Sequence, residues 1–196
     1  MFRKLFGKAT PAHTPTTAPA REDLTTDSGM LCVWDAAPFS GITDYDSWEA
    51  ELLENASILR HIEAGHFVPL DTKGDGAFAI DVRQASPDSM SAREREYLLV
   101  PSRPYLLRST GKIFASGIEH VGADPRNFIA LELEPGDYTV HVNLMDWAEE
   151  PGATDEQGNP TPSALPDMIV FIEKAGSNPP DYRKELETFR TEDSLR

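Results

Sequence analysis

Cysteine is almost absent from this chain, since Cys32 is its only one. No internal disulfide can form, and a reducing compartment such as the cytoplasm fits this composition better than a secreted location. Cys32 lies between Leu31 and Val33 in an apolar run. We therefore expect its thiol to pack as a small hydrophobic group rather than to act as a nucleophile.

Positive charge is also scarce, because 18 lysines and arginines face 33 aspartates and glutamates, for a formal net charge of -15. The field of such a surface repels nucleic acid phosphates and anionic membranes. We expect no nucleic acid partner, and we expect any protein partner to be basic. No apolar run approaches the roughly 20 residues of a membrane-spanning helix.

The basic segment 1–8 (MFRKLFGK) is the one exception to this acidic character. It lacks the apolar stretch and the cleavage site of an export signal. Short amphipathic segments of this kind bind membranes weakly unless a second signal supports them. The sequence therefore predicts a cytoplasmic protein whose only membrane contact would be made through residues 1–8.

The usual signatures of enzymes and of metal sites are missing. No phosphate-binding loop, nucleophile elbow or dinucleotide fingerprint occurs. His61 and His66 are five residues apart with Gly65 between them, which is not the spacing of a zinc-binding helix. The stretch 71–82 has Lys73 and Val82 where a calcium loop needs oxygen ligands. We expect no catalytic residue, no cofactor and no metal.

Composition divides the chain into four segments. We expect a basic N-terminus at 1–8, a linker rich in proline and threonine at 9–23, a folded domain at 24–178, and a short helix with a charged tail at 179–196. The C-terminal helix is predicted because Tyr182, Leu186 and Phe189 recur at helical spacing. The segment 149–166 contains four prolines and two glycines, which predicts a long surface loop.

The folded domain is predicted to be mainly β, an antiparallel sandwich of about eight strands with one inserted helix. The helix is expected over about 46–64, capped by Asp46 or Ser47 and ended by Gly65. Four apolar runs predict buried strands, namely Met30–Trp34, Tyr97–Val100, Ile113–Ala115 and Met168–Ile172.

Alternating apolar residues predict two hairpins. In the segment 128–147, Leu133 is expected opposite Tyr138, which places His141 opposite Ala130 on the outer face. In the segment 67–83, a loop of three or five residues around Gly74 would bring Val68, Leu70, Phe78, Ile80 and Val82 onto one face. Asp71 would then lie opposite Ala77, about 13 Å along the strand from Asp81.

Several strand and turn motifs resemble those of the competence protein J family of cytosolic nuclease inhibitors and of related bacterial immunity-type proteins. The motifs are Val100-Pro101 at the end of a strand, Ser116-Gly117-Ile118, the turn Pro135–Tyr138, and the first strand in 26–36 (TDSGMLCVWDA). The resemblance implies a β-sandwich that has no enzymatic activity and that binds and blocks another protein.

Seven acidic residues are the predicted partner-binding site, because complementary charge speeds association with a basic partner. They are Asp44, Asp46, Glu49, Glu51, Glu54, Glu132 and Glu134. For Glu49, Glu51 and Glu54 a second interpretation is stabilisation of the helix dipole on a solvated face.

Two other functions stay open from the sequence. One is a small-molecule-binding or enzymatic domain whose site gathers His120, His141, Asp146 and Trp147. The other is a scaffold tethered to a membrane through residues 1–8.

Overall fold

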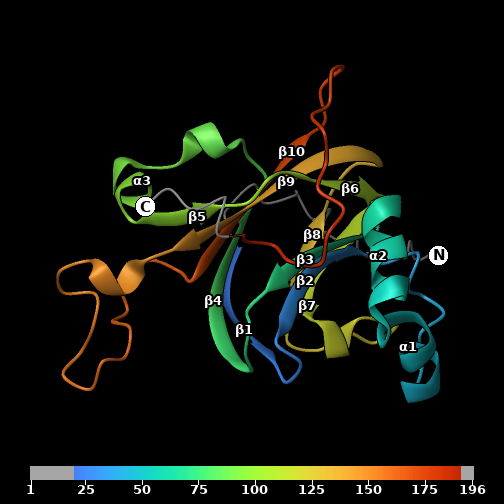
Figure 1. Cartoon of the computed structure of the whole chain (residues 1–196), viewed down its shortest axis with the longest axis horizontal. Helices are drawn as coiled ribbons and strands as arrows, with labels where there is room; N and C mark the ends of the chain where they lie inside the picture. The colour runs from blue at the N-terminus through green and yellow to red at the C-terminus, as the bar shows by residue number, and fades with distance from the viewer. Residues whose placement is uncertain (1–19, 191–196) are drawn as a thin grey trace, which may run out of the picture.

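The computed structural model describes residues 20–190, which form two β-sheets and three α-helices around one main core (Figure 1). Sheet A has the order β1-β4-β10-β9-β5, and β6 also pairs with β9. Sheet B has the order β3-β2-β7-β8. Side chains from both sheets meet in the main core, so the arrangement is sandwich-like, and the prediction of a mainly β domain is confirmed.

The strands of sheet A are β1 (Ala20–Thr26), β4 (Gly76–Arg83), β5 (Leu98–Pro101), β6 (Tyr105–Ser109), β9 (Gly136–Met145) and β10 (Met168–Lys174). Those of sheet B are β2 (Met30–Asp35), β3 (Phe67–Asp71), β7 (Lys112–Gly117) and β8 (Ile129–Glu132). All pairs are antiparallel except β4 with β10. Each of the four predicted strands is present, within two residues of its expected ends.

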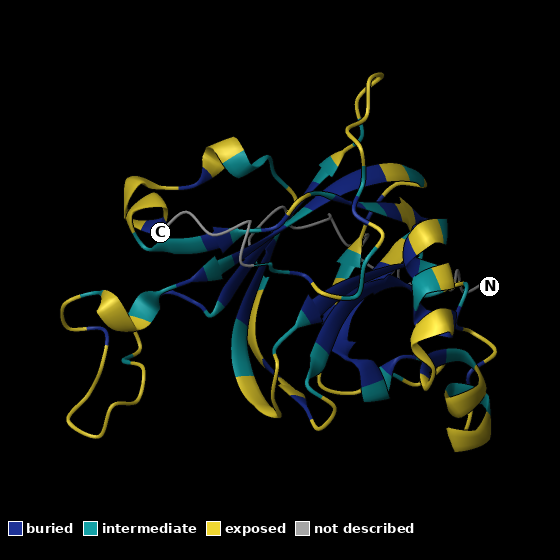
Figure 2. Ribbon diagram, viewed as in Figure 1, coloured by how far each residue is buried: buried dark blue, intermediate teal, exposed yellow. Residues whose placement is uncertain are grey.

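β10 is buried on both faces, which explains its continuous apolar sequence. Val170 and its alternate neighbours face the main core, whereas Ile169 and Phe171 face a second, smaller core. The second core also holds Met90, which precedes α3 (Ala92–Glu96), and Met145 at the end of β9. Figure 2 shows this pattern as buried strands between exposed helix faces and an exposed loop at 150–163.

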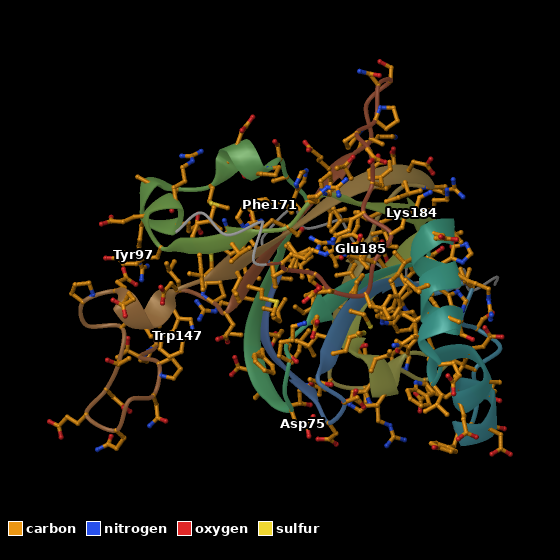
Figure 3. All side chains as sticks on the ribbon, viewed as in Figure 1. Asp75, Tyr97, Trp147, Phe171, Lys184 and Glu185 are labelled. Carbon is orange, nitrogen blue, oxygen red and sulfur yellow. The ribbon has the colours of Figure 1, made fainter. Side chains whose placement is uncertain are left out.

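A buried ion cluster fastens α3 to sheet A. The guanidinium of Arg83 lies 2.7 Å from Asp81 and 2.6 Å from Glu94, and it stacks 5.6 Å from the ring centre of Phe171, which Figure 3 labels. Ser91 and Glu94 form a reciprocal capping box at the start of α3. The short helix therefore depends on β4 for its position.

The predicted helix over 46–64 is two helices, α1 (Tyr45–Leu52) and α2 (Asn55–Ala64). The cap of α1 is Asp44 rather than Asp46 or Ser47, because the Asp44 carboxylate accepts from the Ser47 amide at 2.9 Å. Leu52 and Ile58 are both buried. Six residues apart, they would point about 120° from each other on one continuous helix, so the break lets both face the core. The predicted end at Gly65 is confirmed, with φ +77°.

Both predicted hairpins are wrong, because the chain crosses between the sheets at each turn. β8 pairs with β7, and β9 pairs with β10, β5 and β6, so Leu133 does not face Tyr138. His141 lies opposite Phe171 rather than Ala130. β3 pairs with β2, and β4 pairs with β1 and β10, so Asp71 lies opposite Met30.

The predicted C-terminal helix is also wrong, because the described residues 175–190 contain no helix and form an extended strap. The Thr188 hydroxyl donates to the Pro69 carbonyl at 2.8 Å and accepts from the Asp71 amide at 2.9 Å, both on the outer edge of β3. Tyr105 of β6 donates to the Glu185 carbonyl at 3.1 Å. Figure 3 shows the strap at Lys184 and Glu185. These bonds to an open sheet edge replace the bonds within a helix.

The boundaries at the N-terminal side also differ from expectation. β1 begins at Ala20, so residues 20–23 of the predicted linker are strand. Their backbone pairs with the end of β4, where Ala20 faces Val82. The predicted segment 1–8 and the rest of the linker lie outside the described residues.

Candidate protein-binding groove

Three adjoining hollows of about 850, 390 and 680 Å³ lie between α1 and the end of β8, at the edge of sheet B. The first and second share the segment 122–124, and the second and third share Ala36, Ser40 and Lys112. We call this surface the groove.

The wall of the first hollow is formed by α1 and by the loop that follows η2 (Ile118–His120). The Trp48 indole donates to the Ile118 carbonyl at 2.9 Å, which fixes α1 against this loop. Gly122 has φ +152°, and a Cβ there would lie 2.8 Å from the Ile42 carbonyl oxygen. The Ala123 amide donates to the same carbonyl at 2.9 Å. Only glycine permits this close approach of the loop after η2 to Ile42, both of which line the first hollow.

Large hydrophobic side chains that stay exposed gather along the groove. In the range 20–190 there are three of them, Tyr45, Leu53 and Phe128, with exposed fractions of 66%, 49% and 41%. Tyr45 and Leu53 line the first hollow and Phe128 lines the second. Exposed apolar side chains that cluster in this way mark interaction surfaces, whereas single scattered ones do not.

The exposed aromatic rings are held in place by their neighbours. Tyr45 stacks on Trp48 with ring centres 6.1 Å apart, and Phe128 meets Phe114 edge to face at 5.0 Å. Because the partner rings are themselves packed, Tyr45 and Phe128 lose little conformational freedom when a ligand covers them. The groove therefore presents preorganised apolar contact sites.

Acidic side chains outnumber basic ones along the groove. The carboxylates are Asp44, Glu119, Asp124, Glu132 and Glu134, and the cations are Lys112 and Arg126. Lys112 lies 4.8 Å over the Phe114 ring, and Arg126 lies 3.9 Å from Asp124. Hydrogen bonds from Ser47 lower the pKa of Asp44, so this carboxyl is ionised at neutral pH. The groove has an excess of negative charge.

The predicted acidic residues fall into two groups in the structure. Asp44 lies at one end of the groove, and Glu132 and Glu134 lie at the other. The remaining four, Asp46, Glu49, Glu51 and Glu54, are carried by α1 and by the residue that precedes α2. Glu49 accepts from Tyr45 at 3.4 Å, and Glu51 lies 3.1 Å from His61. The structure thus brings three of the seven into the groove and places the others on its helical flank.

The alternative site of His120, His141, Asp146 and Trp147 is not assembled. His120 lines the groove, beside sheet B. His141 lies in the middle of β9, where burial lowers its pKa despite Glu173 at 3.8 Å. Trp147 donates to Asp167 at 2.8 Å and packs on the second core. Figure 3 shows Trp147 on the side of the molecule away from α1. The structure therefore does not bring His120 together with His141 and Trp147 in one site.

The described residues also bear on the sequence expectations about a metal site, a reactive cysteine and a membrane-spanning helix. Over residues 20–190, no group of three or more His, Cys, Asp or Glu side chains is placed to hold a metal ion. Burial raises the pKa of the Cys32 thiol well above its usual value, the nearby charge of Glu119 raises it further, and Cys32 packs in the main core. No helix in the described part of the chain is long and apolar enough to cross a membrane.

Sequence reasoning missed the apolar half of the groove. Tyr45 lies on the same face of α1 as the buried Leu52, so helical spacing predicts its burial rather than its exposure, whereas Leu53 lies about 100° from Leu52. Phe128 precedes β8. For Leu53, its position off this apolar face was the available indication of exposure. Nothing in the sequence indicated that Glu119 and Asp124 line the groove, because η2 and the loop after it place them there.

Comparison with known proteins gives a likeness in fold. No protein-family model matches the chain, and no curated protein matches its sequence. A solved structure described as Crocagin biosynthetic gene J has a TM-score of 0.52 and 18% sequence identity, over 80% of this chain and 97% of that one. ComJ from Bacillus subtilis, described as an inhibitor of the DNA degrading activity of NucA, has a TM-score of 0.45 and 14% identity, over 80% of this chain and 96% of its own. The weak resemblance predicted from the strand and turn motifs is confirmed at this level, and the chain shares a β-rich fold with the crocagin protein.

Proposed function

We propose that this protein is a cytosolic binding module without enzymatic activity, and that its groove binds and blocks a basic protein of the nuclease or toxin class. The observation that supports this function is the coincidence of two features on one surface. The exposed large hydrophobic residues of the described chain line the groove, and the same groove has an excess of carboxylates.

Such a surface suits a segment of a partner that is rich in arginine or lysine and that also carries apolar side chains. Tyr45 offers an exposed ring face on which a guanidinium could stack. Glu132 and Glu134 are exposed at the other end of the groove, where they would pair with further cations. The apolar contacts would contribute affinity, and the charges would contribute association rate and selectivity.

A nuclease is the first partner class to test, because the motifs around the turn Pro135–Tyr138 resemble those of the competence protein J family. Proteins that act on DNA present basic surfaces, which complement an acidic inhibitor. The overall charge of -15 argues against binding to the nucleic acid itself.

Charge-reversal variants test this function. In the groove variant, Glu132→Lys and Glu134→Lys are combined. The control combines Glu149→Lys and Glu156→Lys, which lie by the exposed loop remote from the groove and change the net charge by the same amount. Each protein is used to capture partners from the native host, and the purified partner is then assayed for nuclease activity with and without the inhibitor.

We expect the wild type and the control to retain and inhibit the same partner, and the groove variant to lose at least about tenfold in affinity, chiefly in association rate at low salt. Equal binding by the groove variant and the control would contradict the assignment of the groove. Absence of any partner for the wild type at low salt would contradict the proposed function itself.

A further inference from the structure

The groove is complementary to a segment of its own chain. We propose that residues 1–8 occupy the groove when no partner is bound, so that the N-terminus acts as an internal competitor. The regulatory meaning of this contact rests on the proposed function, but the contact itself can be measured without any partner.

Composition identifies this segment as the matching ligand. Residues 1–8 contain three cations, Arg3, Lys4 and Lys8, and three large apolar side chains, Phe2, Leu5 and Phe6. The first acidic residue of the chain is Glu22. In a chain with a net charge of -15, this is a cationic and apolar segment without a single carboxylate, and the groove requires both properties.

The length of chain between segment and groove allows the contact. Residues 9–19 carry no Asp, Glu, Lys or Arg, and eleven residues span at most about 36–40 Å. The described chain begins at Ala20, and five residues along β1 the Thr25 amide donates to the Asn127 side chain at 2.6 Å. Asn127 adjoins Arg126 and Phe128, which line the groove. Ala20 is thus about 17 Å along the strand from Thr25, whose partner Asn127 adjoins the groove, and the linker spans about twice that distance.

A tether of this length makes even a weak contact effective. Short flexible linkers give an effective concentration on the order of 1 mM. If residues 1–8 bind the isolated groove with a dissociation constant of about 0.1 mM, they occupy it about nine-tenths of the time. A competing ligand then binds about tenfold more weakly than it would to an open groove.

The test uses a fluorescent synthetic peptide, MFRKLFGK, as the probe and the full-length protein as the receptor. The first variant combines Arg3→Glu, Lys4→Glu and Lys8→Glu, which should release the internal segment. Its control combines Arg95→Glu, Arg103→Glu and Lys184→Glu, three exposed residues that do not line the groove. The groove variant and its Glu149→Lys and Glu156→Lys control are titrated in parallel.

We expect the peptide to bind the N-terminal variant about tenfold more tightly than it binds the wild type or the matched control, with a dependence on salt. The groove variant should lose the peptide, and its control should keep it. Amide signals of Tyr45, Leu53 and Phe128 should differ between the wild type and the N-terminal variant, to the same extent at every protein concentration.

Equal peptide affinity for the wild type and the N-terminal variant would overturn the proposal, as would binding that the groove variant leaves unchanged. Signal differences that grow with concentration and accompany dimers would assign the contact to a second copy instead. A peptide that binds anionic vesicles but not the protein would assign it to a membrane. Each of these results leaves the partner-capture experiment free to support or contradict the proposed function independently.

Discussion

Removal of the charge of Glu94 is the perturbation whose effect follows most directly from the structure. Burial raises the pKa of this carboxyl, but hydrogen bonds from Arg83 and from Ser91, together with the Arg83 charge, outweigh it and hold the pKa at about 2. The usual value is 4.5. Because the pKa of the folded state is the lower one, the ionised carboxylate stabilises the fold at neutral pH.

The magnitude and its pH dependence follow from the two pKa values. Their difference corresponds to about 3 kcal/mol of stability above pH 5. This contribution is lost as the pH falls from about 4.5 to about 2, and somewhat less than half of it remains at pH 3. The substitution Glu94→Gln should therefore destabilise the protein by about 3 kcal/mol at pH 7 and by about half as much at pH 3. Glutamine keeps a capping side chain at this position, which isolates the effect of the charge.

Urea unfolding of wild type and variant at pH 7, 5 and 3 measures these differences. Asp181→Asn is the control, because Asp181 pairs with Arg103 at 3.3 Å while 92% of its side chain is exposed, and we expect little change at any pH. A loss for Glu94→Gln that is the same at pH 7 and pH 3 would refute the assignment of the stabilisation to the ionised carboxylate.

Four further substitutions or treatments test other parts of the structure. Gly122→Ala should cost about 1–3 kcal/mol, since its positive φ and the Ile42 carbonyl exclude a Cβ; an unchanged melting temperature would contradict this. The Cys32 thiol, whose pKa burial raises, should react with an aromatic disulfide at neutral pH only as fast as the protein opens, and immediate reaction would show that it is accessible. Insertion of one glycine after Gly74 should cost less than about 1 kcal/mol, because this turn joins two sheets and sets no register; loss of folding would favour a hairpin. Thr188→Val should cost about 1–3 kcal/mol in urea unfolding, because two backbone groups on the edge of β3 lose their partner, whereas Thr188→Ser should be nearly neutral.

The sequence predicted the buried strands well because their apolar character depends on burial alone. Met30–Trp34 and Met168–Ile172 are covered on both faces, so they read as unbroken apolar runs in any register. The end of α2 at Gly65 was equally predictable, because the left-handed conformation there is a local property. Features set by local chemistry or by burial were therefore available from the sequence.

The pairing of the strands could not be predicted from the sequence, for a geometric reason. Alternation shows which residues face the core, and Val68, Leu70, Ile80 and Val82 are all buried as expected. In a two-sheet fold, however, both sheets point their inner faces at the same core. A turn that crosses between the sheets therefore satisfies the same alternation as a hairpin. The alternation of apolar residues therefore identified the buried face of each strand but not the strand with which it pairs.

Three acidic residues of the groove could be predicted from the sequence, but its exposed apolar residues could not. Acidic residues stay exposed in almost any fold, so Asp44, Glu132 and Glu134 could be proposed from composition. The exposure of Tyr45 and Phe128 depends on how α1 lies on the domain and on the edge position of β8, which are tertiary features. The acidic residues of a binding surface can thus be proposed from the sequence, whereas its exposed apolar contact residues can be identified only once the fold is known.

The failure of the second hairpin has a functional consequence. Had β8 paired with β9, Glu132 would lie with His141 on the outer face of a continuous sheet. In the structure β8 ends sheet B, and Glu132 lies opposite Lys112, across from α1 along the groove. The crossing at Pro135 and Gly136 therefore leaves β8 at an open edge and places Glu132 and Glu134 along the groove that Asp44 lines at its other end. The groove thus depends on the strand order. A change that made β8 pair with β9 would remove the groove, even if every acidic residue were kept.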